Sequence, residues 1–367
     1  MSELENSFFK SVFEFQTLLK ENKELNIKLP RVCLMGIPYS GKSLLLSSII
    51  GLDIIPIAQK LQIKRPLELK LNHLNSGSPY AIFEELEKEK ITDFSNISDI
   101  IQKIQEKKGN YYQPIILNIY SQKYPDMTFI DLPGMTYIPV GACPKNIEEF
   151  GTRLSAEYAN DEFNLLICPI PVNYKSFDEK TYCFKCIENF GESRYRILPV
   201  YTKVDLLEEN PAALKDFKDF INNNSIPFKF GYVCVKNRTE ENLKNNMNLK
   251  EAIEEEKKFF EKGSPLYGKL PKDKVGYDIL IQKIKKSYFE LIKENLIKEN
   301  INLKELINKT ESKEEKKNIS EILKFINDNS YSKNDTFNLH EIKLTKQQDK
   351  KNLEDLIDFI EENAKDD

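Results

Sequence analysis

The sequence predicts an α/β fold in which helices cover both faces of a mainly parallel central sheet, with a small helical bundle attached. Three observations predict it. Short apolar runs alternate with amphipathic stretches, a glycine-containing turn follows the first run, and amphipathic helices stand near both ends of the chain. The runs expected to be strands are 31–35, 67–71, 114–120, 128–131, 165–169, 197–201 and 232–235.

The remaining elements are expected to be helices or connectors. The 367 residues allow one large domain with helical additions or two modest domains, and we expect two compact units. Residues 3–22, 277–307 and 350–363 carry apolar stripes at helical spacing, and packing them together would bury those stripes. Two shorter helices are expected at 80–90 and 97–107. The stretch 311–317 is nearly all charged and is expected to be a solvated connector.

Composition excludes several classes of protein. Lys+Arg 54 against Asp+Glu 58 give a net charge of −4, so we expect no nucleic-acid partner. No apolar run reaches the roughly 18 residues that a membrane helix needs, and Glu3 and Glu5 argue against a signal peptide. We therefore expect a cytoplasmic protein with reduced thiols, and a redox pair at Cys183 and Cys186 is the alternative for two of its six cysteines.

Residues 36–43, Gly-Ile-Pro-Tyr-Ser-Gly-Lys-Ser, fit the pattern G-x-x-x-x-G-K-[ST] between an expected strand and an apolar helix. In such a loop the backbone N–H groups point at phosphate oxygens, the lysine neutralises the outer phosphates and the serine hydroxyl binds Mg²⁺. An accidental turn is the alternative, which the strand–loop–helix context disfavours. The residues predicted to bind nucleotide here are Gly36, Tyr39, Ser40, Gly41, Lys42, Ser43 and Leu44.

Asp131 ends an expected strand and begins the string Asp-Leu-Pro-Gly, residues 131–134. Its carboxylate is expected to hold Mg²⁺ through water, and the N–H of Gly134 to meet the last phosphate. The predicted metal ligands are thus Ser43 and Asp131. The predicted catalytic residues are Lys42, Ser43, Asp131 and Gly134, and Tyr39 and Lys64 are further candidates.

The choice of base is predicted from Thr202-Lys203-Val204-Asp205, which follows another strand. The Asp205 carboxylate can accept hydrogen bonds from the ring N–H and amino group of guanine, which adenine does not offer, so GTP is preferred over ATP. Residues 235–238 end the last strand; they close the base pocket or are an ordinary strand end. The predicted base-side residues are Thr202, Lys203, Asp205, Glu208, Asn237, Arg238 and Glu240.

The residues around these motifs resemble those of dynamin-superfamily GTPases from about residue 5 to 305. The resemblance is carried by 65–67 (Arg-Pro-Leu), 131–141, 202–205, Gly231-Tyr232, and Asn237-Arg238 followed by Glu255, Lys257, Phe259 and Phe260. It implies a P-loop GTPase fold divided into a bundle helix (1–24), a dynamin-type GTPase domain (25–275), a long bundle helix (276–310) and a connector with C-terminal helices (311–367). It also implies GTP and Mg²⁺ as ligands and pairing of two GTPase domains. Because only about 60 residues follow residue 307, we expect this chain to lack the family's stalk and lipid-binding domain.

The chain departs from the family pattern at three positions. Pro38 and Tyr39 replace a glutamine and a serine that helps to hold a monovalent cation, and Ile63 replaces a threonine that binds Mg²⁺ and the attacking water. These changes remove groups that act in the transition state but leave ground-state binding intact. Either hydrolysis is slow, or it relies on Lys64, Arg65 or Gln62; alternatively Tyr39 or a backbone carbonyl substitutes and turnover is normal.

Three functions follow from these observations. The first is a GTPase whose domains dimerise and move the bundle, and the second is a binding module gated by GTP without turnover. The third, an ATPase or nucleotide kinase, is disfavoured by Asp205. Association with a membrane or the cytoskeleton is expected only through partner proteins, which would make the protein peripheral to a membrane.

Overall fold

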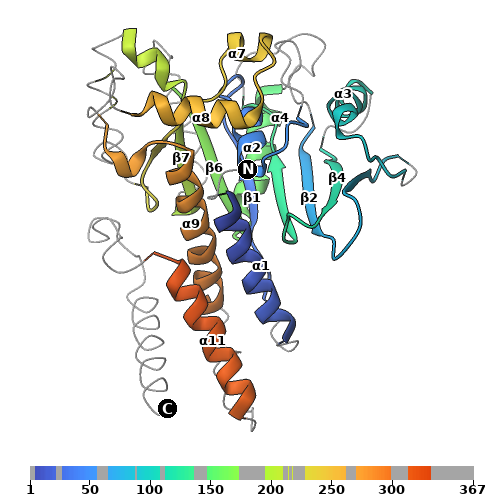
Figure 1. The fold of residues 1–367 in the computed structure, drawn as a ribbon, viewed down its shortest axis with the longest axis vertical. Helices are drawn as coiled ribbons and strands as arrows, with labels where there is room; N and C mark the ends of the chain where they lie inside the picture. The colour runs from blue at the N-terminus through green and yellow to red at the C-terminus, as the bar shows by residue number, and fades with distance from the viewer. Residues whose placement is uncertain are drawn as a thin grey trace.

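One β-sheet forms the centre of the computed structural model (Figure 1), which describes residues 5–21, 27–55, 65–86, 89–107, 112–135, 147–172, 195–209, 214, 217, 228–261, 270–298 and 313–331. Within these ranges the sheet is 8-stranded in the order β3-β4-β2-β5-β1-β6-β7-β8. The strands are β1 (Arg31–Leu34), β2 (Leu67–His73), β3 (Tyr80–Phe83), β4 (Ile115–Ser121), β5 (Met127–Asp131), β6 (Asn164–Pro171), β7 (Ile197–Thr202) and β8 (Val233–Cys234).

The strands β5, β1, β6, β7 and β8 run parallel to one another, so their carboxyl ends meet at one edge. Among the strands of the described residues, two pairings are antiparallel, β2 with β5 and β3 with β4. The mainly parallel sheet that the sequence predicts is confirmed. The central strand β6 is buried at every position, whereas β2 and β4 alternate between buried and half-buried residues because they lie nearer the margin.

The prediction of a helix at 80–90 is wrong. Residues 80–83 form β3, which pairs antiparallel with β4, and Ile91 bridges back to Ala81. The Tyr80 ring stacks on Tyr120 of β4 with centroids 4.7 Å apart, and Phe83 is buried beneath. Cross-strand aromatic pairs of this kind stabilise strands and depend on a partner distant in sequence. The second predicted helix is confirmed as α3 (Ile97–Glu106).

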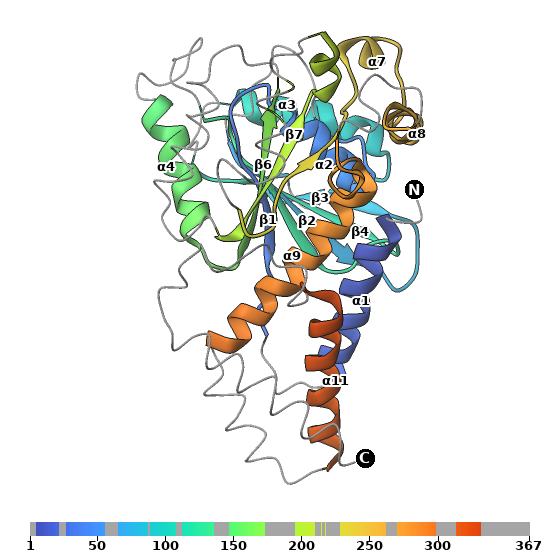
Figure 2. The ribbon, with the colours of Figure 1, turned by 90° about the vertical axis from the view of Figure 1, so that its left-hand side faces the viewer.

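Helices cover both faces of the sheet (Figure 2). Val32 and Leu34 of β1 face one apolar cluster, to which α2 (Lys42–Ile50) and α3 contribute. Cys33 and Met35 face a second cluster on the opposite side, where α4 (Ile147–Asn160) packs through Ala159. Two further helices, α7 (Glu240–Lys244) and α8 (Leu249–Phe259), follow β8, and 3₁₀ turns cover Phe94–Asn96, Val204–Glu209 (η3) and Lys272–Lys274.

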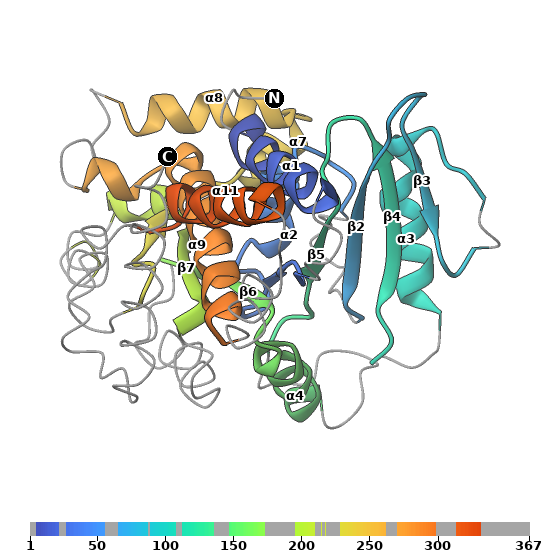
Figure 3. The same cartoon turned by 90° about the horizontal axis from the view of Figure 1, so that it is seen from below.

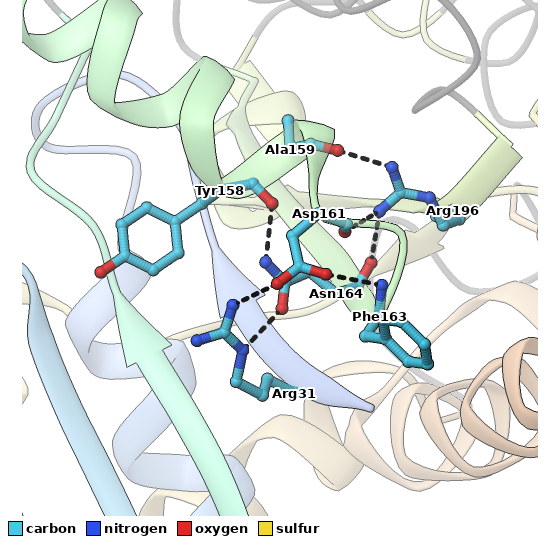
Figure 4. Close-up of polar contacts among 7 residues, drawn as sticks. All are labelled: Arg31, Tyr158, Ala159, Asp161, Phe163, Asn164 and Arg196. Carbon is cyan, nitrogen blue, oxygen red and sulfur yellow. Dashed lines mark hydrogen bonds and ion pairs between the residues drawn. The ribbon is translucent and has the colours of Figure 1, made fainter. Parts of the chain in front are cut away.

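A polar cluster fixes the amino ends of β1, β6 and β7 to the end of α4 (Figure 4). The Arg196 guanidinium donates to the carbonyl oxygens of Ala159, Asp161 and Asn164 at 2.5, 2.7 and 2.9 Å. Arg31 donates to Asn164 Oδ1 at 2.9 Å and to Asp161 Oδ2 at 2.7 Å. Arg196 thus satisfies one carbonyl in the last turn of α4, that of Ala159, and the two arginines together bind the residues that follow the helix, at the edge opposite the carboxyl ends.

Three helices pack side by side as a bundle below the sheet (Figure 3). They are α1 (Glu5–Glu21), α9 (Tyr277–Lys298) and α11 (Lys313–Asn329). Phe15 of α1 contacts Phe289 of α9 and Phe325 of α11, at centroid distances of 5.6 and 6.0 Å. Among the described residues, no helix combines the length and the hydropathy that a membrane span requires.

The third helix of the bundle begins inside the stretch that we expected to be a connector, so that expectation is wrong from Lys313 onward. Ile319, Ile322 and Ile326 lie three and four residues apart and are buried, because they face α1 and α9. The charged residues at the start of α11 belong to a helix with one apolar stripe. The helix expected at 350–363 lies outside the described residues.

Candidate nucleotide-binding site

The phosphate loop joins the end of β1 to α2 at the carboxyl edge of the sheet. Gly41 is the N-cap of α2 with φ +87°, and Tyr39 has φ +60°, a conformation uncommon for a non-glycine residue. Lys42 Nζ donates to the carbonyl oxygens of Gly36 and Ile37 at 3.1 and 2.9 Å, so its ammonium lies within the curve of the loop. The positive end of α2 and this ammonium together favour a bound anion.

Ser43 and Asp131 form a pair suited to a divalent cation. The Ser43 hydroxyl donates to Asp131 Oδ2 at 2.8 Å, and Asp131 Oδ1 is buried without a hydrogen-bond partner. Burial raises the pKa of Asp131 to about 6, although the charge of Lys42 and the bond from Ser43 act against that rise. An orphaned carboxylate oxygen beside a hydroxyl is the donor set that Mg²⁺ prefers, so these residues fit the predicted metal.

Gly134 lies directly against the phosphate loop. The N–H of Met135 donates to the carbonyl of Gly36 at 3.0 Å, which brings the two segments together. A Cβ at Gly134 would lie 2.7 Å from Pro38 N and 2.9 Å from Pro38 Cα, so no other residue fits without displacing the backbone. The segment after Asp131 is therefore in contact with the loop that would hold the phosphates.

The base-side segment is joined to the phosphate loop by a side chain at the end of β7. Thr202 Oγ1 donates to the carbonyl of Ser40 at 2.7 Å, in a buried position. Lys203 then adopts φ +58°, which turns the chain into η3, where Asp205 is half-buried. Glu208 lies in the same turn. A turn at this point places Asp205 at the same edge of the sheet as the phosphate loop.

Asn237 and Arg238 follow β8 and point to different places. Asn237 Nδ2 donates to the carbonyl of Gly41 at 3.3 Å, which brings this residue to the loop. The Arg238 guanidinium instead pairs with Asp53, beyond the far end of α2, at 2.6 and 2.7 Å, so it does not join the other predicted site residues. Glu240 is exposed at the start of α7. The prediction of a nucleotide contact is therefore supported by geometry for Asn237 and not for the side chain of Arg238.

Comparison with known proteins identifies the family. The family model for the dynamin family matches residues 32–179, and that for the dynamin central region matches residues 216–358. The chain belongs to the dynamin superfamily. It is 29% identical over 262 residues to the dynamin-1-like protein drp-1 of Caenorhabditis elegans, with 66% of this chain and 36% of that protein covered. It is 30% identical over 240 residues to dynamin-2 of Bos taurus, with 64% of this chain and 27% of that protein covered. The chain therefore spans about a third of the length of these relatives.

Membership in the family confirms the P-loop GTPase fold, and the three departures from the family pattern can now be placed in the structure. Pro38 lies against Gly134, and the Tyr39 side chain is 62% exposed on the rim of the site. Ile63, Gln62 and Lys64 lie outside the described residues. Arg65 is held by Glu85 through two nitrogens and by the carbonyls of Gln113 and Pro114, so the hypothesis that Arg65 replaces a catalytic group is not supported.

Two residues near the base side were not predicted from the sequence. The hydroxyl of Tyr277, the first residue of α9, donates to Asn237 Oδ1. Glu256 of α8 accepts hydrogen bonds from the backbone N–H groups of Lys236 and Tyr277, at 3.2 and 2.9 Å. Neither belongs to a short motif, and their partners lie between 20 and 40 residues away in the sequence. A local signal in the sequence is Gly276, a glycine directly before Tyr277; in the structure its φ of +92° forms the turn before α9.

Proposed function

We propose that the chain binds GTP with Mg²⁺ and hydrolyses it to GDP and phosphate as a dynamin-like GTPase. One observation carries the proposal: hydrogen bonds from Thr202 and Asn237 to the carbonyls of Ser40 and Gly41 join the base-side segments to the phosphate loop. If the motifs were unrelated turns, hydrogen bonds between the base-side segments and the phosphate loop would not be expected. The curated names of the relatives, dynamin-2 among them, agree with the proposal at the level of the family.

Each group has a role in the reaction. Lys42 and the backbone N–H groups of the loop would neutralise the phosphates, and Ser43 and Asp131 would hold Mg²⁺, which would offset charge on the phosphate oxygens. A water oxygen bonds to the γ-phosphorus while the bond from that phosphorus to the β,γ-bridging oxygen breaks; GDP keeps the bridging oxygen, and both protons of the water leave with the phosphate as H₂PO₄⁻. Gly134 offers its N–H beside the γ-phosphate, and its contact with Pro38 limits how far this segment can move away.

Two GTPase domains are proposed to pair across the nucleotide and to change the position of the bundle. The 62% exposed ring of Tyr39 on the rim of the site is apolar surface that such pairing would bury. Pairing also brings groups from a second chain to a site whose own catalytic positions are substituted. Turnover per molecule is therefore expected to rise with protein concentration.

A second candidate is a nucleotide-gated binding protein that holds GTP without turnover. It is favoured by Pro38, which brings neither a side-chain donor nor an N–H to the loop and packs against Gly134. In that case GTP occupancy alone would change the segment after Asp131 and present it to a partner protein.

The test begins with base selectivity. Wild type and the Asp205→Asn variant are titrated with fluorescent GTP and xanthosine triphosphate in the presence of Mg²⁺. Xanthine carries an oxygen where guanine carries an amino group, so an asparagine N–H in place of the carboxylate should shift preference from GTP to xanthosine triphosphate. Equal binding of both nucleotides by both proteins would refute the guanine site.

Hydrolysis is followed on the same samples as phosphate release over a range of protein concentrations, in sodium and in potassium. Lys42→Ala serves as the control without binding. Release that accelerates with concentration supports the GTPase, and firm binding without release supports the gated binding protein.

A further inference from the structure

The linker that leads into bundle helix α9 is attached to the base side of the candidate site. The N–H of Gly276 donates to the carbonyl of Cys234 at 2.8 Å, directly at the end of β8. One residue later, the N–H of Tyr277 donates to Glu256, whose other carboxylate oxygen accepts from the N–H of Lys236. The first residue of α9 is thus fixed to the chain that precedes Asn237.

The side chain of Tyr277 continues this connection into the phosphate loop. The residue is only 5% exposed, and its hydroxyl donates to Asn237 Oδ1 while Ser48 of α2 is hydrogen-bonded to the same hydroxyl. Burial raises the pKa of Tyr277, so the hydroxyl keeps its proton and remains a donor. With its oxygen occupied in this way, the Asn237 amide must turn its NH₂ group toward the carbonyl of Gly41.

The amide of Asn237 also packs directly on the loop. A Cβ at Gly41 would lie 2.5 Å from Asn237 Nδ2, so this glycine leaves space for the amide and for nothing larger. A small change in the orientation of Asn237 would therefore displace Gly41, the N-cap residue of α2, which directly precedes Lys42. Packed groups of this kind transmit displacements because they have no free volume into which to relax.

We propose that Tyr277 is a positioning residue for the nucleotide site, which acts through Asn237 and links nucleotide affinity to the position of α9. The proposal rests on the proposed guanine-nucleotide site. Because Tyr277 is both a partner of Asn237 and the start of α9, any displacement of the helix origin changes the amide that contacts the loop. Linkage is reciprocal, so nucleotide binding changes the preferred position of the helix origin by the same free energy.

The simpler hypothesis is that the Tyr277 hydroxyl only stabilises the fold. This hypothesis and the positioning role both predict a loss of stability in Tyr277→Phe, so a stability measurement does not distinguish them. A measurement of nucleotide affinity does. The chain offers a matched control on the same helix: Tyr288 is 0% exposed, and its hydroxyl has no hydrogen-bond partner among the described residues. Tyr288→Phe removes a buried hydroxyl without touching the site.

The experiment measures the dissociation constant of N-methylanthraniloyl-GDP with Mg²⁺ for wild type, Tyr277→Phe and Tyr288→Phe, together with the unfolding midpoint of each without nucleotide. We expect Tyr277→Phe to weaken binding roughly fivefold, the factor that corresponds to one neutral hydrogen bond. Tyr288→Phe should stay within about twofold of wild type. In an Asn237→Ala background the effect of Tyr277→Phe on affinity should vanish, because the residue through which it acts is gone.

The outcomes separate the two proposals. Wild-type binding with an unchanged dissociation constant in Tyr277→Phe overturns the role of Tyr277 and leaves the guanine-nucleotide site standing. A fivefold effect that persists in the Asn237→Ala background overturns action through Asn237. A wild type that binds neither GDP nor GTP overturns the proposed function, and the role of Tyr277 falls with it.

Discussion

Replacing Lys229 by methionine should release α9 from the edge of the sheet. Lys229 precedes β8, and its Nζ lies 3.1 Å from Glu290 Oε1 and 2.5 Å from Glu294 Oε1, both on α9. Its side chain is only 10% exposed, so solvent screens these ion pairs weakly. Methionine keeps the length of the chain and removes the charge. The substitution therefore tests how firmly α9 is held against the segment that precedes β8.

The expected loss of stability follows from the pKa of Lys229. Burial alone would lower the pKa of Lys229, but the charges of Glu294 and Glu290 outweigh it and raise the pKa from 10.5 to about 12. A difference of about 1.5 units at about 1.4 kcal/mol per unit corresponds to roughly 2 kcal/mol. A raised lysine pKa contributes this stability in full below pH 10.5 and loses it as pH rises through about 12. The variant also leaves Glu290, 13% exposed, beside a second carboxylate, and broken buried pairs cost about 3–5 kcal/mol.

We therefore expect Lys229→Met to lower the free energy of unfolding by about 2–4 kcal/mol at pH 7, measured by urea denaturation with circular dichroism. Lys10→Met is the control, because Lys10 is 74% exposed and lies 3.9 Å from Glu14 on the same helix face. It should change stability by less than about 0.5 kcal/mol. Equal effects of the two substitutions would refute the reasoning that burial makes the Lys229 pairs strong.

Three further predictions concern the site and its supports. Thr202→Val keeps the shape of the side chain but removes the bond to Ser40, so GTP affinity in a fluorescence titration should fall about fivefold; an unchanged affinity would contradict a role for this bond. Gly134→Ala places a Cβ 2.7 Å from Pro38 N, so single-turnover phosphate release should slow at least about tenfold, and an unaltered rate would show that this contact does not matter for catalysis. Burial raises the pKa of Glu256 from 4.5 to about 8, against the two N–H bonds that lower it, so the folded protein holds a proton that the unfolded chain releases. Stability should then fall as pH rises between these two values, and Glu256→Gln should remove that slope from chemical denaturation measured at several pH values, unless the carboxyl is already ionised in the folded state.

The features that were predicted from the sequence depend on residues close together in the chain. The phosphate loop carries all its chemistry in eight consecutive positions between a strand and a helix, and the structure has that loop in that context. Asp131 and Thr202 were predicted from the ends of apolar runs, because parallel strands bring their carboxyl ends to one edge. These inferences need only the local pattern and the direction of the strands.

The features that were missed depend on partners far away in the chain. Residues 80–83 form a strand because they pair with β4, where Tyr80 stacks on Tyr120. The sequence of residues 80–90 does not indicate this partner. Arg238 was assigned to the nucleotide from its neighbour Asn237, yet its guanidinium pairs with Asp53, 185 residues away in the sequence. C-terminal helices were expected after residue 311, but the charged start of α11 was assigned to a connector, because its place in the helix depends on an apolar stripe that is buried against α1 and α9.

The two ends of the parallel strands differ in how completely their polar groups are satisfied, and this difference itself indicates where the ligand binds. At the amino ends, Arg31 and Arg196 satisfy carbonyls and carboxylates at the end of α4 (Figure 4). At the carboxyl ends, Ser40 Oγ and Asp131 Oδ1 are buried without a hydrogen-bond partner, and Tyr39 adopts a strained positive φ. Buried polar groups in folded proteins are rarely left unpaired, and backbone strain persists only where its surroundings require it. Ser40 Oγ and Asp131 Oδ1 stand beside the Lys42 ammonium and the N-terminus of α2, so a bound phosphate and its cation would supply the partners that these two oxygens lack.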